Sequence, residues 1–505
     1  MELLNLSAPE QHDYNDPTVE RDERRLRDWL TNLPLMDVVE TVRLVQGGLQ
    51  ALNEQKLEIG LRFRLLEEFR STVHRLFVTV DPMHLRQLAL SKVQREQATE
   101  GVEQLLLSMA GGYKVIIREI YFADKHTESR ELFGLSVHRC LEQLGYALLD
   151  SYRFYRAVQP DLFSELHQLY RLARHHGLLD VMTPDEDDVE RQVTTAARYH
   201  TVLLLSLTDP FRLAEGEVGM LKDVLVQHAA LCRVIPGYRA DMVEGQYLVD
   251  LRCGKPPEPA GRNQEPDKFG EPYLLDARQA LTAVRDRLAK TPAKVRSQSP
   301  EAIVLRLLLP EDASVDRRRE SRYPDSRWVK LLLGIEHIHG WLIRAAGKDS
   351  DRMSGEPPPC RVTDTSEHGM GLAWEGGGTG DVRVGELIGV IDEGKSPKLA
   401  IVRSIRVYRE GGMELGAQLI QGSSAPVYCR LAGEGEEEMA VRTLFMPASS
   451  EEQVGATIVA PKGLYEQGRR LLIEVDGRDV HARAGRCVFE GAVFDRFEFS
   501  SDDDG

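Results

Sequence analysis

Asp364-Thr365-Ser366-Glu367-His368-Gly369 is the stretch of sequence that decides the fold of the C-terminal half. It has the form D-x-S-x-x-G and lies between two runs of strand-like composition, residues 360–363 and 370–374. Downstream, residues 401–408 and 413–420 form two further strand candidates around a pair of glycines. Short strands separated by turns are typical of a small antiparallel barrel or sandwich.

An arginine-rich segment precedes this stretch. Residues 316–323 contain the pattern R-x-x-x-R, formed by Arg318 and Arg322. An arginine pair, then D-x-S-x-x-G, then a late hairpin resembles the PilZ domain, a bacterial receptor domain for the second messenger cyclic di-GMP. The resemblance covers residues 315–430 and implies a PilZ-like antiparallel β-barrel.

The two motifs are further apart than the family pattern leads us to expect. Residues 323–363 lie between them. Within this gap, Trp328–Ile343 carries apolar side chains near helical period and contains no proline. We therefore predict an inserted helix over Trp328–Ile343, which packs either on the outside of the barrel or on the N-terminal region.

The resemblance also implies a ligand site for cyclic di-GMP. The residues that match its motifs are Arg318, Arg322, Asp364, Ser366 and Gly369. An arginine fork can bind phosphate oxygens or the O6/N7 edge of guanine, and a carboxylate can accept hydrogen bonds from guanine N1–H and N2–H. A serine hydroxyl could bond a phosphate or a base edge, and a glycine lets the backbone approach the ligand.

Other interpretations of these residues stay open. Asp364 and Ser366 could bond local backbone in a plain hairpin turn. The arginines could form a solvated face, because nearby carboxylates almost balance them. Arg317, Arg319 or Arg327 could replace one of the chosen arginines. The alternative function is then a degenerate PilZ-like scaffold that acts through protein–protein contacts without binding nucleotide.

The N-terminal half has a helical pattern. Buried-face spacing is clearest in the stripe Leu65, Leu66, Phe69, Val73, Leu76 and Phe77. Asp81-Pro82 has the composition of a helix start, with Asp81 as the cap. The acidic run Asp185–Glu190 precedes the helical pattern Asp188–Leu207, so we interpret the run as a solvated helix start rather than a metal site.

These patterns predict a multidomain α+β protein. The segments are an α-helical bundle or array over residues 20–235, a linker and connecting helix over 236–300, the PilZ-like barrel with its inserted helix over 301–430, and a second small β module over 438–500. The module contains a hairpin signal, with strands at Leu471–Val475 and Val480–Arg483 around Asp476-Gly477. We expect the helical region to contact an unknown protein partner.

Composition narrows the function classes. The 505 residues carry a net charge of −16, which disfavours nucleic acid as a partner. The six cysteines form no C-x-x-C pair, and no run of apolar residues is long enough to span a membrane, so we expect a cytoplasmic protein. No catalytic motif appears, and the neighbours His175-His176 point to different helix faces. We therefore predict no enzyme, no metal and no cofactor.

Overall fold

The computed structural model describes residues 4–14, 16–237, 243–259, 270–309, 321–347, 356–377, 380–392, 396–432, 440–449, 453–475 and 478–501. The chain divides into two compact units. The first contains Met1–Pro210 and Glu215–Ser314, and the second contains Phe211–Ala214 and Val315–Gly505. Among the described residues, no helix is long and apolar enough to cross a membrane.

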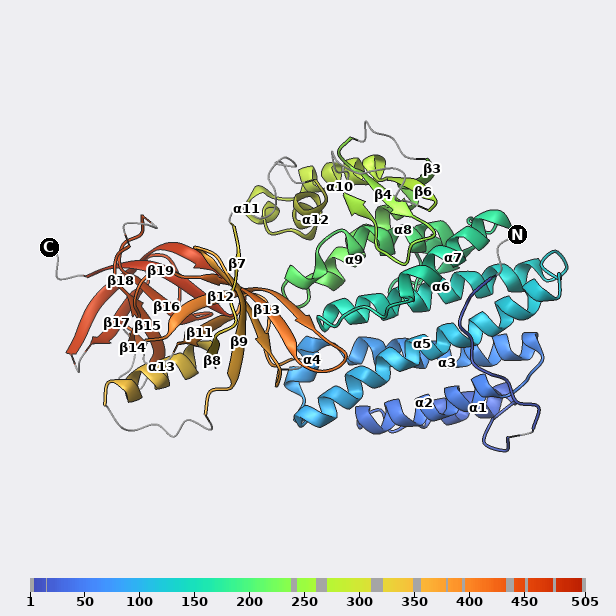
Figure 1. Ribbon diagram of the computed structural model, residues 1–505, viewed down its shortest axis with the longest axis horizontal. Helices are drawn as coiled ribbons and strands as arrows, with labels where there is room; N and C mark the ends of the chain where they lie inside the picture. Colours follow the sequence, from blue (N-terminus) through green and yellow to red (C-terminus); the bar gives the residue numbers. More distant parts are fainter. Residues whose placement is uncertain are drawn as a thin grey trace. The chain divides into compact units, whose positions relative to one another are not determined.

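The first unit is a helical array, as the sequence predicts (Figure 1). The stripe from Leu65 to Phe77 is buried on the helix Ile59–Thr79, which confirms that prediction. The helices, in order, are α1 (Glu23–Thr31), α2 (Val38–Glu54), α3 (Ile59–Thr79), α4 (Pro82–Gln87), α5 (Lys92–Phe122), α6 (Arg130–Arg153), α7 (Leu162–His175), α8 (Thr195–Ser206), α9 (Glu217–His228), α10 (Arg278–Lys290), α11 (Ala293–Arg296) and α12 (Pro300–Leu308).

Side-chain caps define where several helices begin. Asp81 accepts a hydrogen bond from the backbone N–H of Met83 at the start of α4, with Pro82 in the first turn, as predicted. At α5, Ser91 and Gln94 form a reciprocal capping box. Such caps satisfy backbone N–H groups that have no partner within the helix.

The segment that the sequence analysis assigns to a linker contains a four-stranded sheet. Its order is β3 (Arg233–Pro236), β6 (Pro272–Asp276), β4 (Gln246–Asp250) and β5 (Glu258–Pro259). The linker interpretation is wrong for β4 and β6, whereas residues 253–257 are irregular and the expected connecting helix is α10. The apolar run Tyr247–Val249 is buried and forms the centre of β4. The proline- and glycine-rich sequence beside it led to the linker prediction.

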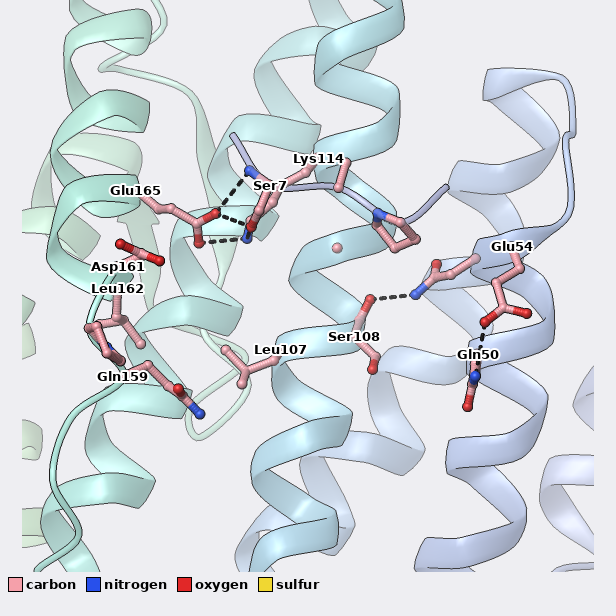
Figure 2. Close-up of a pocket in the computed structure, with 15 residues that line it drawn as sticks. Ser7, Gln50, Glu54, Leu107, Ser108, Lys114, Gln159, Asp161, Leu162 and Glu165 are labelled. Carbon is pink, nitrogen blue, oxygen red and sulfur yellow. Dashed lines mark hydrogen bonds and ion pairs between the residues drawn. The ribbon is translucent and has the colours of Figure 1, made fainter. Parts of the chain in front are cut away.

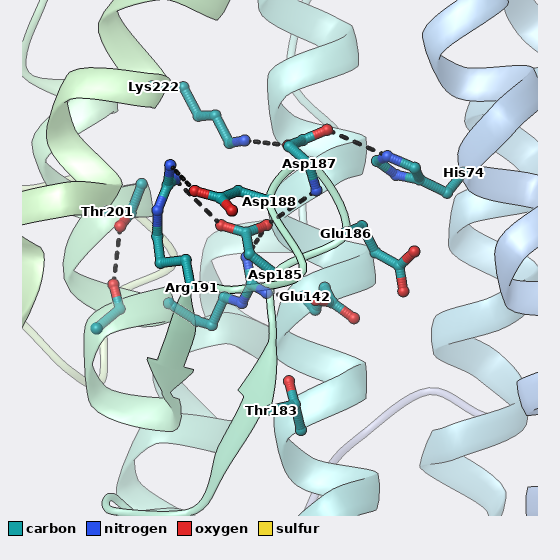
Figure 3. A network of polar contacts seen from close by, with 12 residues as sticks. His74, Glu142, Thr183, Asp185, Glu186, Asp187, Asp188, Arg191, Thr201 and Lys222 are labelled. Carbon is teal, nitrogen blue, oxygen red and sulfur yellow. Dashed lines mark hydrogen bonds and ion pairs between the residues drawn. The ribbon is translucent and has the colours of Figure 1, made fainter.

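The acidic run is not a solvated helix start. It forms the loop between β1 (Met182–Pro184) and β2 (Gln192–Thr194), and α8 begins only at Thr195. Asp185 is fully buried beside Arg191 and Arg198. Asp187 forms an ion pair with Lys222 of α9, and its carboxylate contacts the His74 ring of α3 at 3.1 Å (Figure 3). The loop is therefore held by cationic groups from several helices, which the linear sequence does not place near it.

Beneath this loop lies a buried ionic cluster on α6 and α8. Glu142 pairs with Arg139 at 2.9 Å and with Arg198 at 2.6 Å. Burial opposes the ionisation of Glu142, but the two guanidinium groups outweigh it and lower its pKa to about 2. The neighbouring His138 is also buried, and desolvation lowers its pKa to about 3.

The N-terminal segment lies across the helices. Ser7 donates from its backbone N–H and its hydroxyl to Glu165 of α7, and Glu165 pairs with Lys114 of α5 at 2.6 Å (Figure 2). Further along, the Gln11 side-chain oxygen accepts from the buried Arg62 at 2.6 Å. Burial lowers the pKa of Arg62 to about 10. The segment before α1 is thus part of the first unit.

The second unit contains a closed barrel of six antiparallel strands. The ring runs β8, β9, β10, β13, β12, β11 and back to β8, with β7 added at the edge of β9. The predicted late hairpin is confirmed as β12 and β13. The strand bounds are β7 (Tyr323–Pro324), β8 (Trp328–Leu333), β9 (Pro359–Thr365), β10 (Gly369–Trp374), β11 (Leu387–Ile391), β12 (Lys398–Val407) and β13 (Met413–Leu419).

The helix predicted over Trp328–Ile343 is only half correct. Trp328–Leu333 is the barrel strand β8, and the helix α13 spans Gly334–Ala345. Gly334 has a φ of +74°, a conformation that favours glycine, at the point where strand becomes helix. The periodicity of a short apolar run does not distinguish a strand from a helix. Residues 328–333 form a strand because they pair with β9 and β11.

A second closed barrel follows, and β14 belongs to it rather than to the first barrel. Its ring runs β14 (Ala425–Leu431), β15 (Val441–Met446), β16 (Thr457–Pro461), β19 (Phe494–Ser501), β18 (Arg478–Glu490) and β17 (Arg470–Val475). The predicted hairpin near its end is confirmed by β17 and β18, whose turn lies outside the described residues.

Helix α13 joins the two barrels. Ile335 and Ile338 belong to one hydrophobic cluster with Leu387 of the first barrel and Leu444 of the second. Glu336 pairs with Arg442 of β15 at 2.8 Å, and the His339 ring contacts Tyr428 of β14. Of the two packing surfaces that we predicted for this helix, the structure shows the barrel surface.

Candidate functional site in the first barrel

Strand pairing brings together residues that are far apart in the sequence. Pro324 of β7 pairs with Asp364 of β9, and Tyr323 pairs with Thr365. Arg322, directly before β7, therefore lies at the end of β9. Arg322 and Asp364 are therefore close in space although they are far apart in the sequence. The chain between them forms β8 and α13 and then returns along β9.

Four of the five predicted ligand residues meet at this corner. Arg322 Nη1 donates to Asp364 Oδ1 at 2.5 Å. A Cβ atom placed on Gly369 would lie 3.1 Å from Ser366 Oγ and 3.6 Å from Arg322 Nη2. The Arg322 and Asp364 side chains are 38% and 31% exposed, so the pair is accessible from solvent.

The turn between β9 and β10 positions Ser366. Its backbone N–H donates to the carbonyl of Gly369 at 2.8 Å, and the His368 carbonyl accepts from Leu419 N–H at 2.9 Å. These bonds tie the turn to β13, so the turn is held on both sides. Arg318, Arg317 and Arg319 lie outside the described residues. Arg327 pairs with Asp325 and Asp392 instead of with Asp364.

Two β-bulges flank this corner. The register of β9 against β10 shifts at Thr363, and that of β12 against β13 shifts at Arg403. A bulge re-aims side chains and commonly borders functional sites. The Thr363 hydroxyl lies 3.4 Å from Asp364 Oδ2, so the first bulge brings a polar group to the carboxylate.

Sequence reasoning missed three residues around the corner. Gly371 pairs opposite Asp364, and a Cβ there would lie 2.7 Å from Asp364 Oδ2, so only glycine leaves room for the carboxylate. Gln418 pairs opposite Gly369 and accepts from Arg403 Nε at 2.8 Å. Burial lowers the pKa of Arg403. The alternation of β13 signals that Gln418 faces away from the core, whereas nothing in the sequence signals the bulge at Arg403.

The side chains at this corner are suited to bind an anion, such as a phosphate, together with a nucleobase. It combines guanidinium donors, one carboxylate acceptor and a glycine-lined approach on a rigid barrel edge. Within the described part of the chain, no group of three or more His, Cys, Asp or Glu side chains is placed to hold a metal ion.

Comparison with known proteins matches three successive parts of the chain to one family of proteins. Residues 24–237 match the family model described as the N-terminal domain of the cyclic-di-GMP receptor FimW. Residues 344–426 match the middle PilZ domain of FimW, and residues 427–501 match its C-terminal β-barrel domain.

A curated relative matches over almost the whole chain. The cyclic-di-GMP receptor FimW of Pseudomonas aeruginosa strain PAO1 is 22% identical over an alignment that covers 99% of this chain and 93% of the relative. No solved structure matches the chain. The first barrel therefore belongs to the PilZ domain family, within a chain that has the three-domain order of FimW.

Proposed function

We propose that this protein is a cyclic di-GMP receptor and that the corner formed by Arg322, Asp364, Ser366 and Gly369 is its ligand site. The observation that carries the proposal is the meeting of these residues at one exposed edge of a PilZ barrel. The relative's name, which describes it as a receptor for this nucleotide, supports the ligand's identity.

Each side chain has a role that its chemistry suits. Asp364 accepts hydrogen bonds from guanine N1–H and N2–H, and its pairing with Arg322 already orients the carboxylate. Arg322 turns remaining N–H groups toward a phosphate or the guanine O6/N7 edge. Ser366 bonds a phosphate oxygen, and Gly369 leaves the space that the ligand occupies. Arg318 adds a second guanidinium.

The proposed output runs through protein contacts and not through catalysis. Ligand binding at β7 and β9 bears on β8, the neighbour of β9, which leads directly into α13. Since α13 shares a core with the second barrel, a shift of this helix would be felt in both barrels. We propose a cytoplasmic signalling protein whose helical domain docks on a protein partner.

Selectivity between purines tests the role of Asp364. Cyclic di-AMP has the same phosphate ring, but adenine lacks the N1–H and N2–H donors. A site that is built to bond these donors rejects such an analogue by a large factor, so cyclic di-AMP is expected to bind at least ~100-fold more weakly. Equilibrium dialysis with each nucleotide measures this ratio.

Two other outcomes are informative. Equal binding of both nucleotides would show that the site recognises the phosphates and not the bases, which would overturn the role of Asp364. Binding of neither would favour the non-binding scaffold, a reading that is compatible with the closed Arg322–Asp364 pair.

A further inference from the structure

A cleft in the helical domain carries an unusual set of charges. It lies between α7, α5 and the β4–β6 side of the small sheet, with a volume of about 930 Å³. Three arginines line it, namely Arg171, Arg174 and Arg252, whereas Glu271 is the one carboxylate that lines it among the described residues. Three arginines thus gather in one cleft of a chain with a net charge of −16.

The walls of the cleft are fixed in place. The buried His167 of α7 contacts the carbonyl oxygen of Lys255 at 2.9 Å, which ties the loop after β4 to this helix. Asp250, at the end of β4, accepts hydrogen bonds from the backbone N–H groups of Arg252, Gly270 and Glu271. Arg171 and Arg252 therefore project from elements that are bonded to one another, as a preorganised site requires.

An oxyanion already sits between two of the arginines. Glu271 Oε2 lies 3.6 Å from Arg171 Nε and 3.3 Å from Arg252 Nε, and Glu271 Oε1 accepts from the Tyr273 hydroxyl at 3.0 Å. The Arg174 guanidinium carbon lies 4.9 Å from the centre of the Tyr273 ring, within the range of a cation–π contact.

A phosphate group matches this cleft better than a carboxylate does. A carboxylate has two oxygens, and Glu271 shows that one carboxylate engages Arg171, Arg252 and Tyr273. A terminal phosphoryl group has three oxygens and more negative charge, so it suits a third guanidinium and the adjacent His175 imidazole. A cavity of this volume accommodates a small molecule.

We propose that this cleft binds a small phosphorylated ligand, whose phosphoryl oxygens are held by Arg171, Arg174 and Arg252. The site is separate from the barrel corner and does not depend on the function proposed for that corner. Through it, the helical domain would respond to a second anionic signal.

A second cavity of the helical domain, among the described residues, has a different charge pattern. It has a volume of about 410 Å³, and the carboxylates Glu54, Asp161 and Glu165 line it together with a single cation, Lys114 (Figure 2). Its carboxylates disfavour an anion, so this cavity serves as an internal contrast to the arginine-lined cleft.

Calorimetric titration of the full-length chain with inorganic pyrophosphate at low ionic strength tests the proposal. Arg252→Ala is expected to weaken binding ~10-fold, because it removes a charge-assisted bond. Glu271→Gln is expected to tighten binding ~3–10-fold, because it removes the competing carboxylate and keeps the side chain's shape. Arg233→Ala, an exposed arginine on β3 of the same sheet, is the matched control and should change nothing.

Two further arms separate the alternatives. Arg322→Ala should leave pyrophosphate binding unchanged, and citrate should bind at least ~10-fold more weakly than pyrophosphate. The proposal is overturned if pyrophosphate gives no saturable binding, if Arg322→Ala abolishes binding while Arg252→Ala does not, or if citrate binds equally well. A loss of affinity in Glu271→Gln, with the circular dichroism of the wild type, would also contradict it.

Discussion

Asp364→Ala and Arg322→Ala are each expected to weaken the binding of cyclic di-GMP by about 2–4 kcal/mol, or roughly 30- to 1,000-fold in Kd. Both side chains belong to one ion pair at the barrel edge, and the bound nucleotide would cover them. Removing either group leaves its partner, or a ligand donor, without a charged counterpart in a desolvated contact. Titration calorimetry of each variant measures the loss.

The double variant sharpens this result. Since the two side chains bond each other, the double variant Arg322→Ala/Asp364→Ala should lose less binding free energy than the sum of the two single losses. The difference measures the coupling energy between the two side chains. Arg361→Ala is the matched control, because Arg361 is an exposed arginine on β9 that pairs opposite Trp328 and Ala373, away from the turn. If Arg322→Ala binds like the wild type while Asp364→Ala does not, the arginine assignment is wrong and Arg317, Arg319 and Arg327 become the candidates.

Glu142→Gln is expected to destabilise the helical domain by about 3–5 kcal/mol. The substitution keeps the side chain's shape but leaves Arg139 and Arg198 buried without the carboxylate that they share. Urea unfolding followed by circular dichroism at 222 nm measures the change, since most of the helices lie in this domain. Glu131→Gln is the control, because Glu131 is an exposed residue in the first turn of the same helix.

The pH dependence of this variant gives a second check. The pKa of Glu142 is lowered to about 2 in the folded state, so its ionised form contributes stability above the pKa of the unfolded chain, near 4.5. That contribution is lost as the pH falls from about 4.5 toward 2. The difference between wild type and Glu142→Gln should therefore be constant above pH ~5 and shrink below it. A difference under ~0.5 kcal/mol at neutral pH would contradict the account of the cluster.

Local signals in the sequence were sufficient for much of the fold. The stripe on α3, the cap at Asp81 and the hairpin of β12 and β13 each depend on neighbouring residues, and each is confirmed. D-x-S-x-x-G predicted the candidate corner for a similar reason, because a turn and its flanking strands are local.

What the sequence did not reveal depends on distant partners. Trp328–Leu333 is a strand because β9 and β11 lie on either side of it, and its own apolar run is ambiguous. Asp185 of the acidic loop is buried, and α3, α8 and α9 supply cations around the loop. At the candidate site, the bulge that presents Arg403 arises from the register between two strands and has no signature in either one.

The central claim is that this PilZ barrel binds cyclic di-GMP, and calorimetric titration of the full-length wild-type chain tests it most directly. Titration at two temperatures prevents a vanishing enthalpy from hiding the reaction, because binding changes the heat capacity. The account predicts saturable binding of cyclic di-GMP with a Kd of ~1 µM or lower and no measurable binding of GMP under the same conditions. An absence of heat with cyclic di-GMP at both temperatures, or equal binding of GMP, would contradict it.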